Sequence, residues 1–87
     1  MINVITTKSF DKSFQKKDKF VQNKARERIK IFREDPFNVV LNNHALTGEH
    51  ENKRSFNVTG DYRIMFYYFN KDTVVFTDIG THPELYE

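Results

Sequence analysis

The alternation of apolar and polar residues predicts that the chain begins with a strand followed by a helix. Residues 2–6 form a short run rich in β-branched side chains, which is typical of a strand. Ser9 is a residue type that caps helix N-termini, and Phe10 and Phe14 follow it four residues apart. We therefore expect a first helix that starts with Ser9 as its N-cap and buries this aromatic face.

A second, longer helix is expected after a break in the pattern at Lys17 and Asp18. Apolar residues then recur at spacings of four, four and three, at Val21, Ala25, Ile29 and Phe32. This helix should end at Asp35, because the residue before a proline avoids the helical conformation. The short break between the two helices predicts an antiparallel hairpin.

The second half of the sequence has the two-residue period of strands. Residues 37–52 are interrupted by Asn and Gly, and we expect a loop there. Three strands are expected at residues 53–59, 62–69 and 73–79, joined by turns into a meander. Residues 62–69 are apolar at nearly every position, which predicts a central strand covered on both faces.

These patterns predict one α+β domain, residues 1–87, with the order β-α-α-β-β-β. The helix hairpin is expected on one face of a twisted antiparallel sheet. The chain has no cysteine, so nine Phe and four Tyr must supply much of a core that neither disulfides nor a thiolate metal site can reinforce. No apolar run reaches the ~20 residues of a membrane span and no leader pattern opens the chain, so we expect a cytoplasmic location.

Charge divides the sequence into a basic part and an acidic part. Residues 8–34 hold ten of the fourteen Lys and Arg residues but only four of the twelve Asp and Glu residues. This excess of positive charge predicts a polyanionic partner for the helical half. A solvated helix face gives the same pattern, so charge alone leaves both interpretations open.

Side chains suited to phosphate chemistry lie near the ends of the expected strands. The cationic candidates for holding a phosphate are Lys53, Arg54 and Arg63. The candidates for proton transfer are His44, Asp61 and His82, with Tyr86 four residues beyond the last of these. If the loop, the central strand and the C-terminus converge, these groups suit phosphodiester transfer in RNA, in which a 2′-hydroxyl attacks the neighbouring phosphate.

Each candidate also has an ordinary structural interpretation. His50, the third histidine, is expected to be an incidental surface residue, and His44 can simply bond to backbone. Arg63 can pair with a nearby aspartate, and Tyr86 can close the core. A metal site is disfavoured, because positions 44, 50 and 82 lack the spacing of helical metal ligands and no cysteine is present.

Four short motifs occupy these positions. They read HALTG from His44, SFNV from Ser55, DYRIMF from Asp61, and DIGTH from Asp78 with Tyr86 four residues beyond. Together with the expected order of elements, they resemble the RelE/ParE superfamily of toxin–antitoxin toxins over the whole chain. The closest branch is that of RelE/StbE and YafQ-like mRNA interferases.

The resemblance implies an endoribonuclease that needs no metal or cofactor and cleaves mRNA in the ribosomal A site. It also implies neutralisation by a cognate antitoxin. His82 is then the main general acid or base, with His44 and Asp61 as further proton-transfer residues. Arg63 stabilises the phosphate, and Tyr86 orients an RNA base or assists catalysis.

The resemblance also gives the remaining basic residues a role. Lys53 or Arg54 would help Arg63 to hold the scissile phosphate. The basic helices would bind ribosomal RNA through Lys16, Lys17 and Lys24.

The sequence departs from the family pattern at some positions. Asn57 stands where YafQ-like members have a histidine, and an amide cannot act as an acid or base. Glu49 and Glu51 make the preceding loop acidic. Two other functions therefore stay open: a ParE-like, non-enzymatic inhibitor of DNA gyrase, which needs no His82 and Tyr86 pair, and a catalytically degenerate antitoxin-binding homologue.

Overall fold

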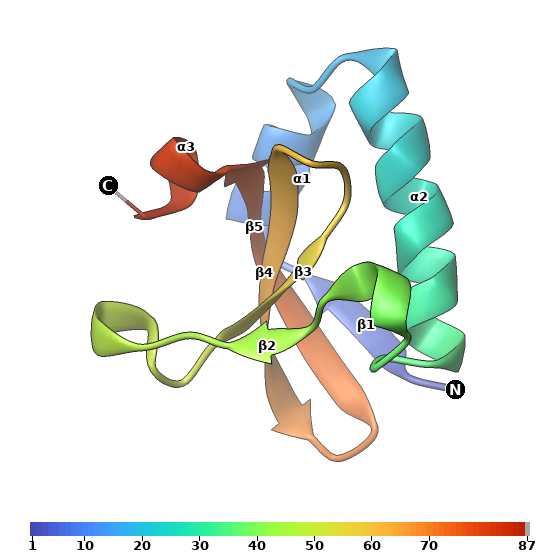
Figure 1. Cartoon of the computed structure of the whole chain (residues 1–87), viewed down its shortest axis with the longest axis vertical. Helices are drawn as coiled ribbons and strands as arrows, with labels where there is room; N and C mark the ends of the chain where they lie inside the picture. Colours follow the sequence, from blue (N-terminus) through green and yellow to red (C-terminus); the bar gives the residue numbers. More distant parts are fainter. Residues whose placement is uncertain (87) are drawn as a thin grey trace.

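The computed structural model describes residues 1–86, and it is built around a five-stranded sheet (Figure 1). The strands are β1 (Asn3–Thr6), β2 (His44–Ala45), β3 (Arg54–Asn57), β4 (Tyr62–Asn70) and β5 (Thr73–Thr81). The α-helices of the described residues are α1 (Lys8–Gln15), α2 (Lys19–Glu34) and α3 (His82–Tyr86). The expected α+β fold is confirmed. Figure 1 also shows α3 on the opposite side of the sheet from α2.

The strand order in the sheet is β1-β5-β4-β3-β2. The β2/β3, β3/β4 and β4/β5 pairs are antiparallel, and β3, β4 and β5 form the predicted meander. Strand β1 departs from the expected antiparallel sheet, because it pairs in parallel with β5, in a register that sets Ile5 opposite Val75. A parallel pair needs a long crossover connection, and α1, α2 and the β2–β4 segment together provide it.

The helix termini follow the local capping chemistry. Thr7 caps α1, because its hydroxyl accepts a hydrogen bond of 3.1 Å from the Phe10 amide. The expected start at Ser9 is wrong: Ser9 lies inside α1 and donates to Asp78 at 3.1 Å. Asp18 caps α2 by accepting from the Val21 amide at 2.9 Å. Helix α2 ends just before Asp35, as predicted.

An aromatic cluster joins α2 to the sheet. Phe32 is fully buried, stacks on Phe56 with 4.8 Å between ring centroids, and meets Phe66 edge-on at 4.9 Å. Val21 and Ala25 lie on the same buried face of α2. The face that the spacing of apolar residues predicted is therefore the face that packs on the sheet.

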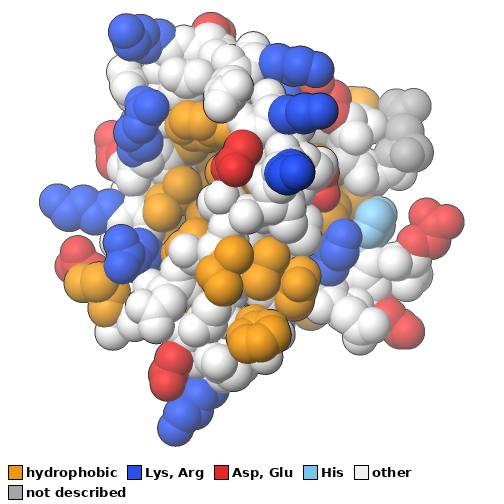
Figure 2. Space-filling model, turned by 180° about the vertical axis from the view of Figure 1, so that it is seen from behind, with side chains coloured by type: hydrophobic (Ala, Val, Ile, Leu, Met, Phe, Trp, Pro, Cys, Tyr) orange, Lys and Arg blue, Asp and Glu red, His pale blue; other side chains and the backbone are white. Residues whose placement is uncertain are grey.

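Strand β4 is covered on both faces only in its first half. Ile64, Met65 and Phe66 are buried, whereas Phe69 is 69% exposed and Tyr67 and Tyr68 are also open to solvent. The expectation of a fully covered strand is wrong for this second half, because α3 packs at the opposite end, where β5 ends beside the start of β4. Figure 2 shows hydrophobic side chains gathered near the centre of one face of the molecule.

Residues 37–52 are more ordered than the expected loop. They contain two 3₁₀ turns, η1 (Val39–Leu41) and η2 (Gly48–His50), and the two-residue strand β2. Strand β2 depends on its pairing with β3, in which His44 lies opposite Ser55. In the described part of the chain, no helix is long and apolar enough to cross a membrane.

Candidate functional site

The site begins with a row of residues that crosses three strands near one end of the sheet. Asn57, Arg63 and Gly80 are directly opposed on β3, β4 and β5. The Arg63 Nε donates a hydrogen bond of 3.3 Å to Asn57 Oδ1. Because side chains alternate along strands, this row faces away from the core side that carries Phe56 and Ile64. Arg63 is therefore held on the outer face of the sheet.

Helix α3 brings two aromatic candidates to the same end of the sheet. It begins immediately after β5, and the His82 and Tyr86 rings lie 4.5 Å apart within it. Tyr86 also meets His50 of η2 edge-on, with ring centroids 5.7 Å apart. His50 was expected to be an incidental surface residue, but the folded loop sets it against α3 and it lines the same hollow.

Arg63 of the sheet, His50 of η2 and both aromatic residues of α3 line one hollow of about 480 Å³. Its lining residues are Asn42, His44, Leu46, Thr47, His50, Arg63, His82 and Tyr86. A neighbouring hollow of about 390 Å³ contains Asp61 and shares Arg63 and His82 with the first. The structure thus brings together His44, Arg63, His82 and Tyr86, with Asp61 on the adjoining side.

His44 has a defined hydrogen-bond partner. Its Nδ1 lies 2.8 Å from the carbonyl oxygen of Asn42. A carbonyl can only accept, so Nδ1 must carry a proton in this contact, and in a neutral ring the lone pair is then on Nε2. This is the form of imidazole that can take a proton from a hydroxyl group.

Lys53 and Arg54 lie apart from the hollow. Arg54 donates from Nε to Asn43 Oδ1 at 2.8 Å, and its guanidinium lies 5.3 Å from the centroid of the Phe37 ring. It is opposite Phe66 in the register, on the face of the sheet away from Arg63. The Lys53 backbone amide closes the preceding loop by donating to the His50 carbonyl at 2.8 Å.

The three helical lysines differ in their surroundings. Lys16 is exposed, and Lys24 lies 3.8 Å from Glu27 in a surface ion pair. The Lys17 side chain is only 12% exposed, and its Nζ lies 3.6 Å from Glu84 Oε1. Lys17 is therefore held against the fold, whereas Lys16 is open to a partner.

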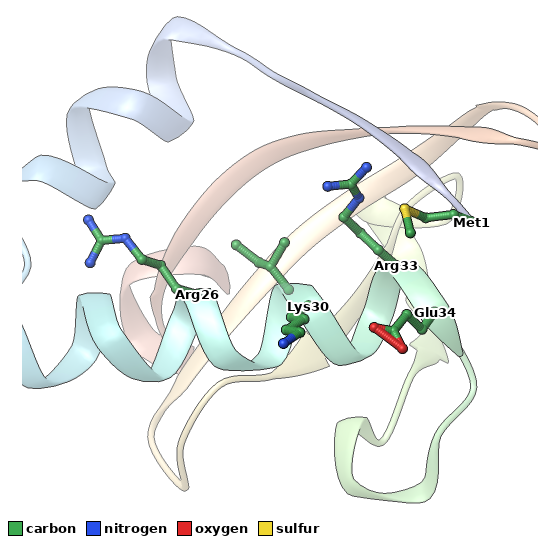
Figure 3. Close-up of a pocket in the computed structure, with 6 residues that line it drawn as sticks. Met1, Arg26, Lys30, Arg33 and Glu34 are labelled. Carbon is green, nitrogen blue, oxygen red and sulfur yellow. The ribbon is translucent and has the colours of Figure 1, made fainter.

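A separate hollow of about 340 Å³ lies along α2 (Figure 3). It is lined by Met1, Arg26, Ile29, Lys30, Arg33 and Glu34. Arg33 donates from Nε to the Ile2 carbonyl at 3.1 Å, which joins the N-terminal segment to this helix. Its cationic side chains belong to the basic half of the chain, and its lining includes none of the candidate catalytic residues.

Candidate metal ligands are not grouped in residues 1–86. No three His, Asp or Glu side chains of this part of the chain converge as a metal site would require.

Comparisons with known proteins identify relatives of the whole chain. The family model described as "Bacterial toxin of type II toxin-antitoxin system, YafQ" matches residues 2–87. The structure is similar to that of YafQ from E. coli strain BL21(DE3), with a TM-score of 0.82, 18% sequence identity and all of both chains covered. No curated protein matches the sequence.

Two solved toxin–antitoxin complexes also contain similar chains. One is the E. coli DinJ–YafQ complex, with a TM-score of 0.77, 18% identity and full coverage of both chains. The other is the RelBE2 complex from Mycobacterium tuberculosis, with a TM-score of 0.77, 18% identity and coverage of 93% of this chain and 98% of that chain. At these identities the likeness shows a shared fold.

Proposed function

The chain belongs to the YafQ family of bacterial toxins of type II toxin–antitoxin systems, and from this premise we propose that it is a ribosome-dependent endoribonuclease that cleaves mRNA in the A site. One observation carries the proposal: His44, Arg63 and His82 come from three separate parts of the fold and line one hollow. A cation together with two imidazoles is a sufficient set of groups for phosphodiester transfer without a metal.

The proposed reaction is an attack by the 2′-hydroxyl on the adjacent phosphorus. His44 Nε2 takes the hydroxyl proton as the new P–O2′ bond forms. The P–O5′ bond breaks, and His82 donates a proton to the departing 5′-oxygen. The products are a 2′,3′-cyclic phosphate and a free 5′-hydroxyl, so the step consumes no water and no cofactor.

Arg63 and Tyr86 support this reaction in different ways. Arg63 faces the negative charge that grows on the phosphate oxygens, and its bond to Asn57 keeps the guanidinium oriented before RNA arrives. Tyr86 offers an aromatic face on which an RNA base can stack, a contact worth about 1–3 kcal/mol. Asp61, in the adjoining hollow, is proposed as a further proton-transfer residue that acts beside His82.

The remaining basic residues are proposed to bind RNA outside the scissile phosphate. Lys53 and Arg54 lie away from the hollow, so their contacts would be with flanking nucleotides or ribosomal RNA. Lys16 and Lys24, with the cationic side chains of α2 in Figure 3, would bind ribosomal RNA through its phosphates. Such binding neutralises phosphates and should weaken steeply as salt is added.

A cognate antitoxin is the proposed protein partner. Two of the similar solved structures are toxin–antitoxin complexes, which supports the same type of partner here. A purified complex should keep the toxin inactive until the antitoxin is removed.

The proposed activity can be tested in a cell-free translation extract with a reporter mRNA, by mapping the mRNA ends by primer extension. We expect cuts within the reading frame when the message is translated and none when initiation is blocked. Intact mRNA in both conditions would contradict the proposal. A supercoiling assay would then show whether the protein inhibits DNA gyrase, and no inhibition would leave a binding protein without catalysis.

The ribosome-binding surface can be tested separately by charge reversal. Lys16→Glu and Lys24→Glu together should lower co-sedimentation with ribosomes by about tenfold at moderate salt, because each removes a phosphate contact. Lys71→Glu is the control for each single reversal, Lys16→Glu and Lys24→Glu, since it makes the same change of charge at an exposed residue of the β4–β5 turn. Equal binding by all variants would contradict the assignment of this surface.

A further inference from the structure

Helix α3 is too short to be stable by itself. It has five residues, Figure 1 shows it at the end of the chain, and it carries both His82 and Tyr86. An isolated helix of this length is unstable in water, because the hydrogen bonds of a single turn do not offset the conformational entropy lost in forming it. The positions of His82 and Tyr86 therefore depend on the contacts that fix α3 to the rest of the fold.

One such contact is a reciprocal cap at the start of α3. The Thr81 amide donates to Glu84 Oε1 at 2.7 Å, and the Glu84 amide lies 3.4 Å from Thr81 Oγ1. This is the capping-box arrangement, in which a Thr and a Glu three residues apart satisfy each other's backbone amides. The shorter of the two bonds uses one particular carboxylate oxygen, Oε1.

The same oxygen faces Lys17. Lys17 Nζ lies 3.6 Å from Glu84 Oε1 and 5.6 Å from the centroid of the Tyr62 ring. Lys17 belongs to the short connection between α1 and α2, and its backbone amide donates to the Phe14 carbonyl at 3.1 Å. Glu84 thus links α3 to the helix hairpin as well as to the end of β5.

Gly80 shows how closely Glu84 approaches the sheet. A Cβ atom at Gly80 would lie 3.0 Å from Glu84 Oε1 and 3.2 Å from Glu84 Cβ, closer than ordinary carbon contacts. Gly80 is also the residue directly opposite Arg63 on β4. The contact that fixes α3 is therefore made beside the strand position that presents the phosphate-binding cation.

We propose that Lys17 and Glu84 are positioning residues that lock α3 onto the sheet and so set His82 and Tyr86 relative to Arg63. The catalytic part of this assignment rests on the proposed nuclease function, whereas the structural part does not. Lys17, which the sequence offered as a ribosome-binding residue, acts within the toxin in this account. The lowered pKa of Glu84, caused first by the Thr81 amide and also by the charge of Lys17, agrees with a carboxylate that stays ionised in this contact.

The test compares three substitutions that remove different parts of the contact. Glu84→Gln keeps a cap acceptor but loses the charge, Glu84→Ala removes both, and Lys17→Met keeps the apolar stem but removes the ammonium group. Lys71→Met is the control, since it makes the same change of charge at the exposed β4–β5 turn. Each variant is checked for cooperative thermal unfolding before use.

Two readouts separate positioning from RNA contact. The first is amide hydrogen exchange at Thr81 by NMR, which needs no activity. We expect faster exchange by about tenfold in Glu84→Ala, a smaller effect in Glu84→Gln and Lys17→Met, and none in Lys71→Met. The second is cleavage per ribosome-bound toxin, which should fall by about 10- to 100-fold in Glu84→Ala and less in Lys17→Met, with ribosome co-sedimentation unchanged.

The outcomes distinguish this proposal from the proposed function. Wild-type exchange at Thr81 in Glu84→Ala would overturn the lock, whatever the cleavage result. Loss of ribosome binding in Lys17→Met with unchanged Thr81 exchange would overturn it as well and make Lys17 an RNA contact. Faster Thr81 exchange in variants of a protein whose wild type cleaves nothing would uphold the structural lock and refute the nuclease function.

Discussion

Asn57 orients Arg63: across a directly opposed pair on β3 and β4, the Arg63 Nε donates a hydrogen bond of 3.3 Å to the Asn57 Oδ1. The resemblance placed a histidine of related toxins at this position, which made the amide look like a lost catalytic group. In this structure the amide has another use, because it restricts the long arginine side chain. His44 and His82, the proton-transfer groups of the proposed reaction, line the same hollow as Arg63.

Removing this amide should slow cleavage without unfolding the protein. Asn57→Ala leaves Arg63 in place but unrestrained, and we expect the rate of mRNA cleavage to fall by about tenfold. The matched control is Asn23→Ala, since Asn23 accepts a 3.2 Å bond from Arg26 on the exposed face of α2. Equal rates for Asn57→Ala and the control, measured at saturating ribosomes, would show that Arg63 needs no such restraint.

A methyl group at Gly80 should displace α3. The added Cβ would lie 3.0 Å from Glu84 Oε1 and 3.2 Å from Glu84 Cβ, so Glu84 must move away from β5. We expect Gly80→Ala to lower the free energy of unfolding by about 1–3 kcal/mol and cleavage by about 100-fold. Gly60→Ala is the control, since nothing lies within 4 Å of its added Cβ. The measurements are urea unfolding and the cleavage rate of both variants. Equal stability and equal cleavage in Gly80→Ala and Gly60→Ala would contradict the prediction.

The Lys17–Glu84 contact should make stability depend on pH in the acid range. The pKa of Glu84 is lowered, chiefly by the hydrogen bond from the Thr81 amide and also by Lys17, against the opposing effect of burial. A pKa below the ordinary value of 4.5 means that the ionised carboxylate stabilises the fold. This contribution is complete above that value and is lost as the pH falls through the lowered pKa.

Glu84→Gln provides the measurement for this pH effect. The difference in free energy of unfolding between the wild type and Glu84→Gln should be constant above pH 4.5 and shrink at lower pH. Urea unfolding across the acid range gives this difference directly. A difference that stays constant down to about pH 2 would contradict the assigned role of the carboxylate.

The aromatic core should be sensitive to truncation at its centre. Phe32 is fully buried and contacts the rings of Phe56, Phe66 and Phe76. Phe32→Ala should cost about 3–5 kcal/mol, a large part of the stability of a domain this small. Phe20 is 64% exposed on the same helix, and Phe20→Ala should cost less than about 0.5 kcal/mol. Similar urea midpoints for the two variants would contradict the described core.

The sequence predicted the fold wherever a pattern repeats over several turns or residues. The buried positions Val21, Ala25 and Phe32 of α2 follow directly from their spacing, and the meander follows from its turn residues. The two-residue strand β2 was not predicted, because it exists only through its pairing with β3. The prediction that β4 is covered on both faces was wrong at its exposed end for a related reason. The apolar content of a strand does not show where the element that covers it ends.

The candidate site was only partly accessible from the sequence. Arg63 and His82 stand at strand ends, and motif resemblance pointed to both, although their roles stay predictions. No sequence pattern pointed to His50 as a site residue, because its place beside Tyr86 depends on how η2 folds against α3. Arg54 had a good signal by charge, but the alternation of β3 sends it to the other face of the sheet.

The most direct test of the proposed nuclease function is primer extension on a translated reporter mRNA with the wild type and His82→Ala. We expect the wild type to make translation-dependent cuts within the reading frame. These cuts should be lost in His82→Ala, which should still sediment with ribosomes. Cuts of the same position and intensity by both proteins would contradict the assignment of His82 as the acid. The absence of any cut by the wild type would contradict the nuclease function itself.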